Sequence, residues 1–148
     1  MKNKILIIAG DPNSINSEII SKTWKEIKPS LKKRLYLIAN FDLIKKQLKR
    51  IKSKMPICKI NQIEESYSDN KLKIIDVPLN FKSPFNVSLW ESRKYILKCF
   101  DLAHQLSQNK YIKGLNDGIL YSPRKIIDIG CSVGISTEYL QDAFPKET

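Results

Sequence analysis

The sequence is short of the residues from which several kinds of functional site are built. Its 148 residues include five glycines, three cysteines and a single histidine, His104. Cys58, Cys99 and Cys131 are far apart, odd in number and form no CxxC pair. Such spacing argues against a disulfide framework and against a zinc site. We therefore expect reduced thiols, a cytoplasmic location and no metal site formed by this chain.

A long apolar run is also missing. The first run, residues 5–9, follows Lys4 and is cut off by Gly10-Asp11-Pro12, so it is too short for a signal peptide. A membrane span needs about 20 apolar residues, and no run approaches that length. We interpret residues 4–9 as a buried first strand and expect no membrane partner.

Acidic residues are scarce between residues 22 and 59. This segment holds 13 lysines and arginines but only Glu26 and Asp42 as acids, and the difference equals the net charge of the whole chain, +11. One interpretation is a nucleic-acid surface. Because the segment shows no run of aromatic stacking platforms between its charges, we favour a solvated helix face. A nucleic-acid partner is therefore not expected.

What the sequence does contain is an alternation of strand and helix patterns. Apolar runs predict strands at residues 4–9, 34–39, 57–60, 72–77 and 124–129, and helical patterns cover 17–28, 41–54, 88–108 and 135–144. This order is typical of an α/β fold, Rossmann-like, with a largely parallel sheet flanked by helices. We expect the strand at 124–129 to join the sheet begun by residues 4–9.

The ends of these helices carry their own signals. Pro29 is expected to end the first helix. Asn40 is a plausible N-cap for the second, and Ser88 and Glu91 form a capping box that opens the long helix. Because His104 lies beside the apolar stripe of that long helix, we expect a structural or exposed histidine rather than a ligand or base.

Gly10-Asp11-Pro12 is the first motif with chemical meaning. A glycine after a strand permits positive φ and close approach of another group. Asp11 follows the carboxyl end of a strand, where α/β sheets place their ligands. The plainer alternative is a tight turn in which Asp11 caps the following helix.

The segment around this motif reads Gly10-Asp11-Pro12-Asn13-Ser14-Ile15-Asn16-Ser17-Glu18-Ile19. The 4-hydroxythreonine-4-phosphate dehydrogenase family opens with a strand, then Gly-Asp-Pro, a Gly-Ile-Gly element and Pro-Glu-Ile at the start of a helix. Residues 1–113 resemble this opening lobe in motif, order and spacing. Ser14, Asn16 and Ser17 stand where the family has two glycines and a proline.

The resemblance implies a fold similar to that of the isocitrate and isopropylmalate dehydrogenases. A complete family member is a homodimer that oxidises a phosphorylated hydroxy-amino acid with NAD and a divalent metal, in the synthesis of pyridoxal phosphate. Gly10, Asp11, Pro12 and Glu18 carry over as active-site framework. The family's metal-binding histidines and phosphate-binding residues fall beyond residues 1–113, so catalytic residues stay unassigned and we expect this fragment to be inactive.

A second motif lies near the end of the sequence. Residues 119–148 resemble motif I of class I S-adenosylmethionine-dependent methyltransferases, in which an apolar strand ends in an acid and a glycine-rich turn leads into a helix. The resemblance implies cofactor binding by Asp128, Gly130, Ser132 and Gly134, with Ser132 in place of a glycine. Only 14 residues follow Gly134, so this domain too is incomplete.

These observations divide the chain into a dehydrogenase-like lobe at 1–113, a junction at 114–123 and a methyltransferase-like unit at 124–148. Relative to either family the fold is incomplete. We expect first a truncated or diverged relative of the vitamin B6 dehydrogenase. The alternatives are a methyltransferase fragment and a non-enzymatic, basic α/β binding module.

Overall fold

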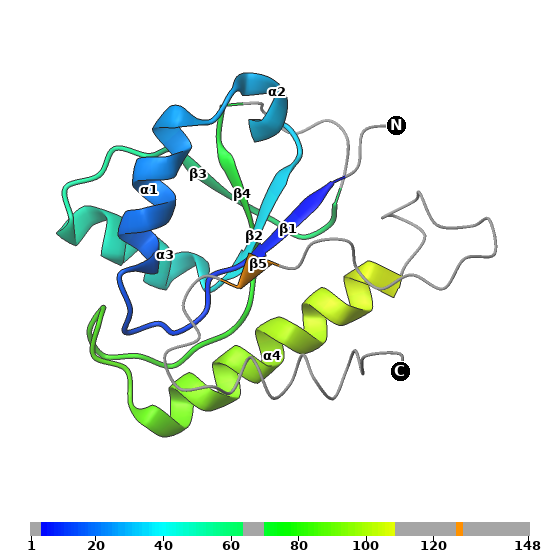
Figure 1. Ribbon diagram of the computed structural model, residues 1–148. Coiled ribbons are helices and arrows are strands. Elements are labelled where there is room, and N and C mark those ends of the chain that lie inside the picture. The colour runs from blue at the N-terminus through cyan, green and yellow to red at the C-terminus, as the bar shows by residue number, and fades with distance from the viewer. Residues whose placement is uncertain (1–3, 64–69, 109–126, 129–148) are drawn as a thin grey trace, which may run out of the picture.

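Five strands form a single parallel sheet with helices on both faces (Figure 1). The computed structural model describes residues 4–63, 70–108 and 127–128. In chain order the elements are β1 (Ile5–Ile8), α1 (Asn16–Glu26), α2 (Pro29–Lys32), β2 (Leu35–Ala39), α3 (Phe41–Arg50), β3 (Ile57–Ile60), β4 (Leu72–Asp76), α4 (Leu89–Gln108) and β5 (Ile127–Asp128). No described helix is long and apolar enough to cross a membrane.

The strand order is β3-β4-β2-β1-β5, and every neighbouring pair is parallel. Ile8 of β1 lies beside Ile38 of β2 on one side and Asp128 of β5 on the other. Because the strands are parallel, their carboxyl ends meet along one edge of the sheet. The loop after β1 and the start of α3 both lie at this edge.

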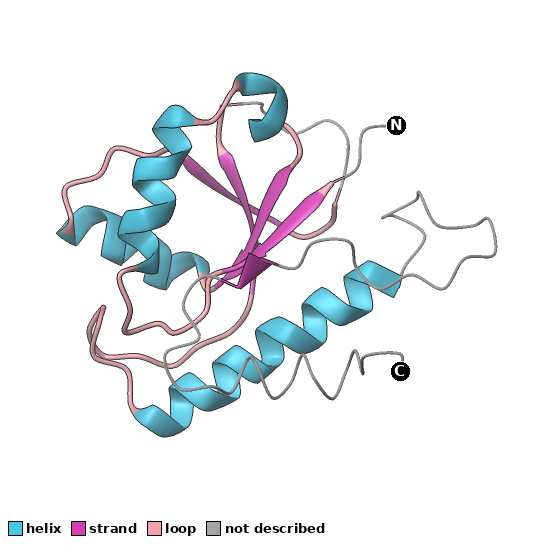
Figure 2. Ribbon diagram, in the orientation of Figure 1, coloured by secondary structure: helices cyan, strands magenta, loops and turns pink. Residues whose placement is uncertain are grey.

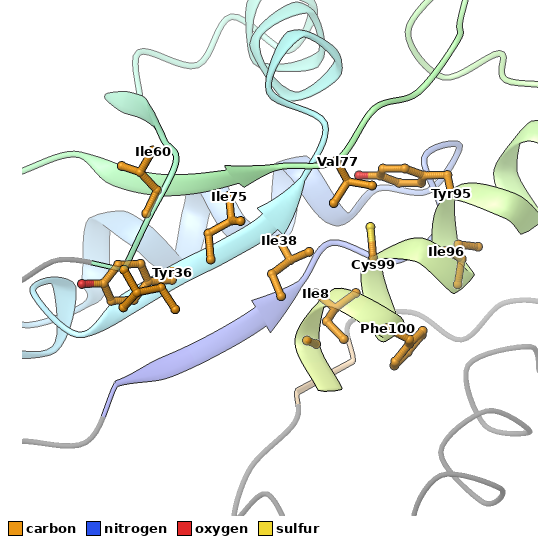
Figure 3. Close-up of a cluster of buried hydrophobic side chains, with 12 residues drawn as sticks. Ile8, Tyr36, Ile38, Ile60, Ile75, Val77, Tyr95, Ile96, Cys99 and Phe100 are labelled. Carbon is orange, nitrogen blue, oxygen red and sulfur yellow. The ribbon is translucent and has the colours of Figure 1, made fainter. Parts of the chain in front are cut away.

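Each face of the sheet buries a separate apolar core. Along β2, Leu35 and Leu37 pack with α1 and α3, whereas Tyr36 and Ile38 pack with α4. This period of two is expected of a strand covered on both faces. Figure 2 shows α4 on the opposite side of the sheet from α1 and α3, and Figure 3 shows the residues of the α4 core.

Most of the predicted elements are confirmed. Strands β1 to β4 begin and end within one residue of the expected positions, and β5 lies inside the predicted range 124–129. The predicted pairing of the last strand with the first is present in β5 and β1. The Asn40 side chain accepts from the Leu43 amide at 2.9 Å, as an N-cap should. Ser88 accepts from the Glu91 amide at 3.3 Å at the start of α4.

One prediction about a helix end is wrong. Pro29 does not end the first helix, because α1 stops at Glu26 and Ile27 turns to extended backbone. Pro29 instead opens α2 as its first residue, where the missing amide hydrogen costs nothing. The predicted junction at 114–123, the helix at 135–144 and the turn at 130–134 lie outside the described residues.

Candidate functional site at the carboxyl end of the sheet

The loop after β1 is held by a compact set of hydrogen bonds. Gly10 adopts φ 72°, as expected for a glycine in this turn. The Asp11 carboxylate accepts from the Asn13 amide at 2.8 Å, and the Asp11 carbonyl accepts from the Ser14 hydroxyl at 2.7 Å. The tight turn is therefore present, but Asp11 does not cap the helix. The N-cap is Ile15, whose side chain makes no capping bond.

Two asparagines fasten this loop to the rest of the molecule. Asn13 makes a pair of hydrogen bonds with the backbone of Val87, donating at 2.8 Å and accepting at 2.7 Å. The buried side chain of Asn16 donates to the carbonyl of Ala9 at 2.6 Å. The loop is thereby tied to the segment before α4, even though Asn16 replaces a glycine of the family motif.

The neighbouring strand ends contribute polar groups that are already engaged. The Asn40 amide donates to the Tyr95 hydroxyl at 2.8 Å, and the Asn40 side chain donates to the Val77 carbonyl at 2.9 Å. Asp76 accepts from the Phe41 amide at 2.7 Å and from Lys59 at 2.7 Å. The hydrogen bond to Asp76 raises the pKa of Lys59. These bonds fix the start of α3 and the end of β4.

A small cavity lies between the β1 loop, α1, α3 and α4. Its volume is about 10 Å³, enough for one water molecule. The lining includes Gly10, Ser17, Gln47 and Tyr95. Gln47 donates to the carbonyl of Pro12 at 2.7 Å. The Ser17 hydroxyl is buried, with the residue 2% exposed, and has no hydrogen-bond partner among the described residues.

The buried Tyr95 hydroxyl and Cys99 thiol are unreactive near neutral pH. Burial raises the pKa of Tyr95 well above its ordinary value. Burial also raises the pKa of Cys99 to about 12, against a smaller opposing effect of its hydrogen bond with Tyr95. Both groups are therefore neutral near pH 7, and neither is an activated nucleophile. Figure 3 shows the two side chains on α4, with Tyr95 beside Val77.

The structure brings together part of the predicted framework. Gly10, Asp11 and Pro12 all line the cavity. Glu18 is not in the lining and instead forms an ion pair with Lys22 at 2.7 Å, one turn along α1.

The residues of the second motif are only partly described. The backbone of Asp128 is in β5, paired with β1 at the same sheet edge. The side chain of Asp128 and all of Gly130, Ser132 and Gly134 lie outside the described residues.

Sequence reasoning missed three cavity residues: Ser17, Gln47 and Tyr95. In the comparison with the dehydrogenase motif, Ser17 counts only as the residue that replaces a proline. A serine at the start of a helix can nevertheless supply a hydroxyl to a site. Gln47 is the uncharged polar residue among the lysines of α3, and this difference was the available signal in the sequence. Tyr95 lies one turn before Cys99, so the buried stripe of α4 could have been extended back to it.

The described residues do not fit a metal ion or a dinucleotide by themselves. Among residues 4–63, 70–108 and 127–128, no three His, Cys, Asp or Glu side chains gather to hold a metal. A cavity of about 10 Å³ is far smaller than the pockets that hold cofactors.

The architecture of this chain recurs in solved structures of 4-hydroxythreonine-4-phosphate dehydrogenases. The enzyme from Burkholderia phymatum matches with a TM-score of 0.64 at 18% identity, over 75% of this chain and 34% of that one. The enzyme from Klebsiella pneumoniae matches with a TM-score of 0.60 at 23% identity, over 72% of this chain and 33% of that one. This chain has the fold of part of these dehydrogenases.

The matched part spans about a third of the length of the dehydrogenase structures. The α/β fold expected from the sequence is thus confirmed. The likeness in fold also supports the resemblance of residues 1–113 to these dehydrogenases. No protein-family model matches the chain. A search of curated proteins also finds no match.

Proposed function

We propose that this chain is a partial, diverged relative of the 4-hydroxythreonine-4-phosphate dehydrogenases that binds a small polar ligand at its β1–α1 loop without oxidising it. The ligand class, a phosphorylated hydroxy-amino acid, follows from the resemblance of the first lobe. The observation that carries the proposal is the buried Ser17 hydroxyl, which lines the cavity and has no partner among the described residues.

The chemistry of this edge suits such a ligand. The N-cap of helix α1, Ile15, makes no side-chain capping bond, although the Ser14 hydroxyl accepts from the Asn16 backbone amide at 3.3 Å. The partial positive charge of this first turn favours an anionic group. A buried hydroxyl without a partner carries a free-energy penalty that a water or one polar group of a ligand could remove. Because the cavity has room for one water-sized group, only a single hydroxyl or phosphate oxygen would reach Ser17, with the rest of the ligand at the β1–α1 loop outside. The rigid bonds of Asn13 and Asn16 hold the loop in place before any ligand arrives.

Turnover is not expected from this chain. A histidine-rich metal site of the family's kind needs several histidines, and the sequence has one, His104. That residue lies near the end of α4 and is absent from the cavity lining. The family's hydride transfer to NAD requires metal-polarised oxygen atoms, and the residues for that chemistry are not among those matched.

Calorimetric titration of the 148-residue chain with 4-phosphohydroxy-threonine tests the binding proposal. We expect measurable heat of binding with the unaltered chain. The Ser17→Ala variant should bind at least tenfold more weakly. Because the Ser17 hydroxyl has no partner among the described residues, its removal should leave the fold intact. Ser30→Ala is the matched control, since Ser30 is exposed on α2. Absent heat, or equal binding by both variants, would reject the proposal.

A second candidate is binding of S-adenosylmethionine by the segment that begins with β5. The observation in its favour is the register of β5, which brings the Asp128 backbone beside Ile8 at the carboxyl edge of the sheet. Titration with S-adenosylmethionine should then give heat that Asp128→Ala removes. No heat at high ligand concentration would eliminate this candidate.

A further inference from the structure

The helical layer formed by α1, α2 and α3 carries the positive charge of this protein. Residues 22–59 include the second half of α1, all of α2 and α3 and the turn that follows α3, and they contain 13 lysines and arginines but only two acids. Figure 1 shows α1 and α3 on the same side of the sheet, with the segment from α3 to β3 running beside α1. Most of these lysines and arginines thus belong to elements that cover one face of the sheet.

A contact between two serines brings part of this charge together. Ser21 of α1 and Ser53 of the turn after α3 have hydroxyl oxygens 2.5 Å apart. Lys52 and Lys54 flank Ser53, and Lys22 follows Ser21, so these lysines lie near one another. The Lys49 carbonyl accepts from the Lys52 amide at 3.1 Å, so Lys49 in the last turn of α3 lies close to the same group of lysines. We call the following five exposed residues the turn cluster: Lys22, Lys25, Lys49, Lys52 and Lys54.

Most of the turn cluster has no acidic partner nearby. Lys22 pairs with Glu18 at 2.7 Å, whereas no ion pair of Lys25, Lys49, Lys52 or Lys54 is found among the described residues. Four like charges on adjacent elements repel one another, so an external polyanion would relieve this repulsion.

The backbone of Lys52 provides an independent observation. The Ser53 amide donates to the Leu48 carbonyl at 2.9 Å and the Lys52 amide to the Lys49 carbonyl, the two bonds of a Schellman motif. Lys52 therefore occupies the left-handed position after the helix, with φ 55°. Glycine is the residue best suited to this position. A lysine here carries backbone strain that glycine would avoid, which is consistent with a use for its charge.

In contrast to the expectation from the sequence alone, we propose that the turn cluster binds the phosphate backbone of double-stranded nucleic acid without sequence preference. The exposed large apolar residues among the described positions are Ile15, Ile19, Leu89, Trp90 and Leu97, and none falls within residues 22–59. The surface therefore offers no aromatic platform for the bases of a single strand and no apolar anchor for a bilayer. Regularly spaced duplex phosphates match an array of cations on rigid helices.

Fluorescence anisotropy with a labelled DNA duplex of mixed sequence tests the proposal on the full 148-residue chain. If the four lysines without an ion pair among the described residues contact phosphates, the logarithm of affinity should fall with the logarithm of salt with a slope of about −3.6. A fourfold rise in salt should then weaken binding roughly 150-fold. Absence of binding at low salt, or a salt-independent affinity, would overturn the proposal.

A pair of matched double variants locates the surface. Lys49→Gln with Lys52→Gly should weaken duplex binding roughly tenfold and reduce the salt slope by about 2. Arg93→Gln with Lys98→Gln removes the same charge from exposed positions on α4 and should change affinity less than twofold. Equal losses in both variants would overturn the assignment to the turn cluster.

The Lys52→Gly change also separates binding from folding. Glycine relieves the positive-φ backbone, so a loss of binding in this single variant cannot come from unfolding. Unchanged duplex binding in a correctly folded Lys52→Gly chain, or tighter binding to a labelled single strand or to phosphatidylserine vesicles than to the duplex, would contradict the proposal.

Discussion

Tyr95→Phe should destabilise the fold while leaving its shape unchanged. The Tyr95 side chain is 1% exposed, and its hydroxyl accepts from the backbone amide of Asn40 at 2.8 Å. Asn40 is itself buried and caps α3 through its side chain. The removed oxygen therefore anchors the point where β2 ends and α3 begins.

The magnitude follows from what phenylalanine leaves behind. A buried donor that loses its partner costs roughly 1–3 kcal/mol. The Cys99 thiol also loses its hydrogen bond with Tyr95, but thiols are weak hydrogen-bonding groups and add little. The void is smaller than a methyl group, so the cavity contribution is minor. We expect a loss of about 2 kcal/mol in the free energy of unfolding, a large share of the 5–15 kcal/mol typical of a domain.

Urea unfolding followed by circular dichroism measures this change, with the urea dependence of the free energy expected to stay constant. Hydrogen exchange gives the residue-level test, because the Asn40 amide should exchange faster in Tyr95→Phe. Cys99→Ala is the control, since it removes the thiol but retains the bond from Asn40 to Tyr95. A stability change below about 0.5 kcal/mol with normal Asn40 protection would refute the reasoning.

Three further changes have defined outcomes. Gly10→Ala should cost about 1–2 kcal/mol in urea unfolding, because alanine is strained at φ 72°; a neutral effect would contradict the observed turn. Lys52→Gly should stabilise the fold by about 1 kcal/mol in the same assay, and destabilisation would contradict the left-handed turn at φ 55°. Because the pKa of Cys99 is raised from 9.0 to about 12, its neutral thiol contributes to the free energy of unfolding. This contribution is fully present below about pH 9 and is lost as the pH rises toward about 12, by roughly 1.4 kcal/mol per pH unit. Alkaline unfolding should therefore be less steep in Cys99→Ala, and identical pH profiles for the two proteins would oppose the assignment.

The sheet could be predicted because its strands are short apolar runs bounded by clear turn signals. Residues 4–9 and 72–77 are largely apolar, as strands covered on both faces should be. The structure buries Ile8, Ala9 and the apolar residues of 72–77, whereas residues 4–7 are partly buried. Asn40 and Ser88 were recognisable as caps because a short polar side chain precedes an amphipathic pattern. Pro29 was misread because a proline both stops one helix and suits the first turn of another.

The candidate site was harder to predict because it depends on contacts between distant residues. Nothing in the local sequence indicates that Asn13 bonds the backbone of Val87, 74 residues away. Likewise, burial of Gln47 and Tyr95 depends on how α3 and α4 pack around the β1 loop. The charge excess of residues 22–59 was visible in the sequence, but its gathering around Ser53 required the structure.

The most direct test of the central claim is titration of the 148-residue chain with 4-phosphohydroxy-threonine, followed in the same sample by NADH absorbance after NAD and a divalent metal ion are added. We predict binding that depends on Ser17 and no NADH formation. Either a lack of binding, or NADH formation at a rate proportional to protein concentration, would contradict the account.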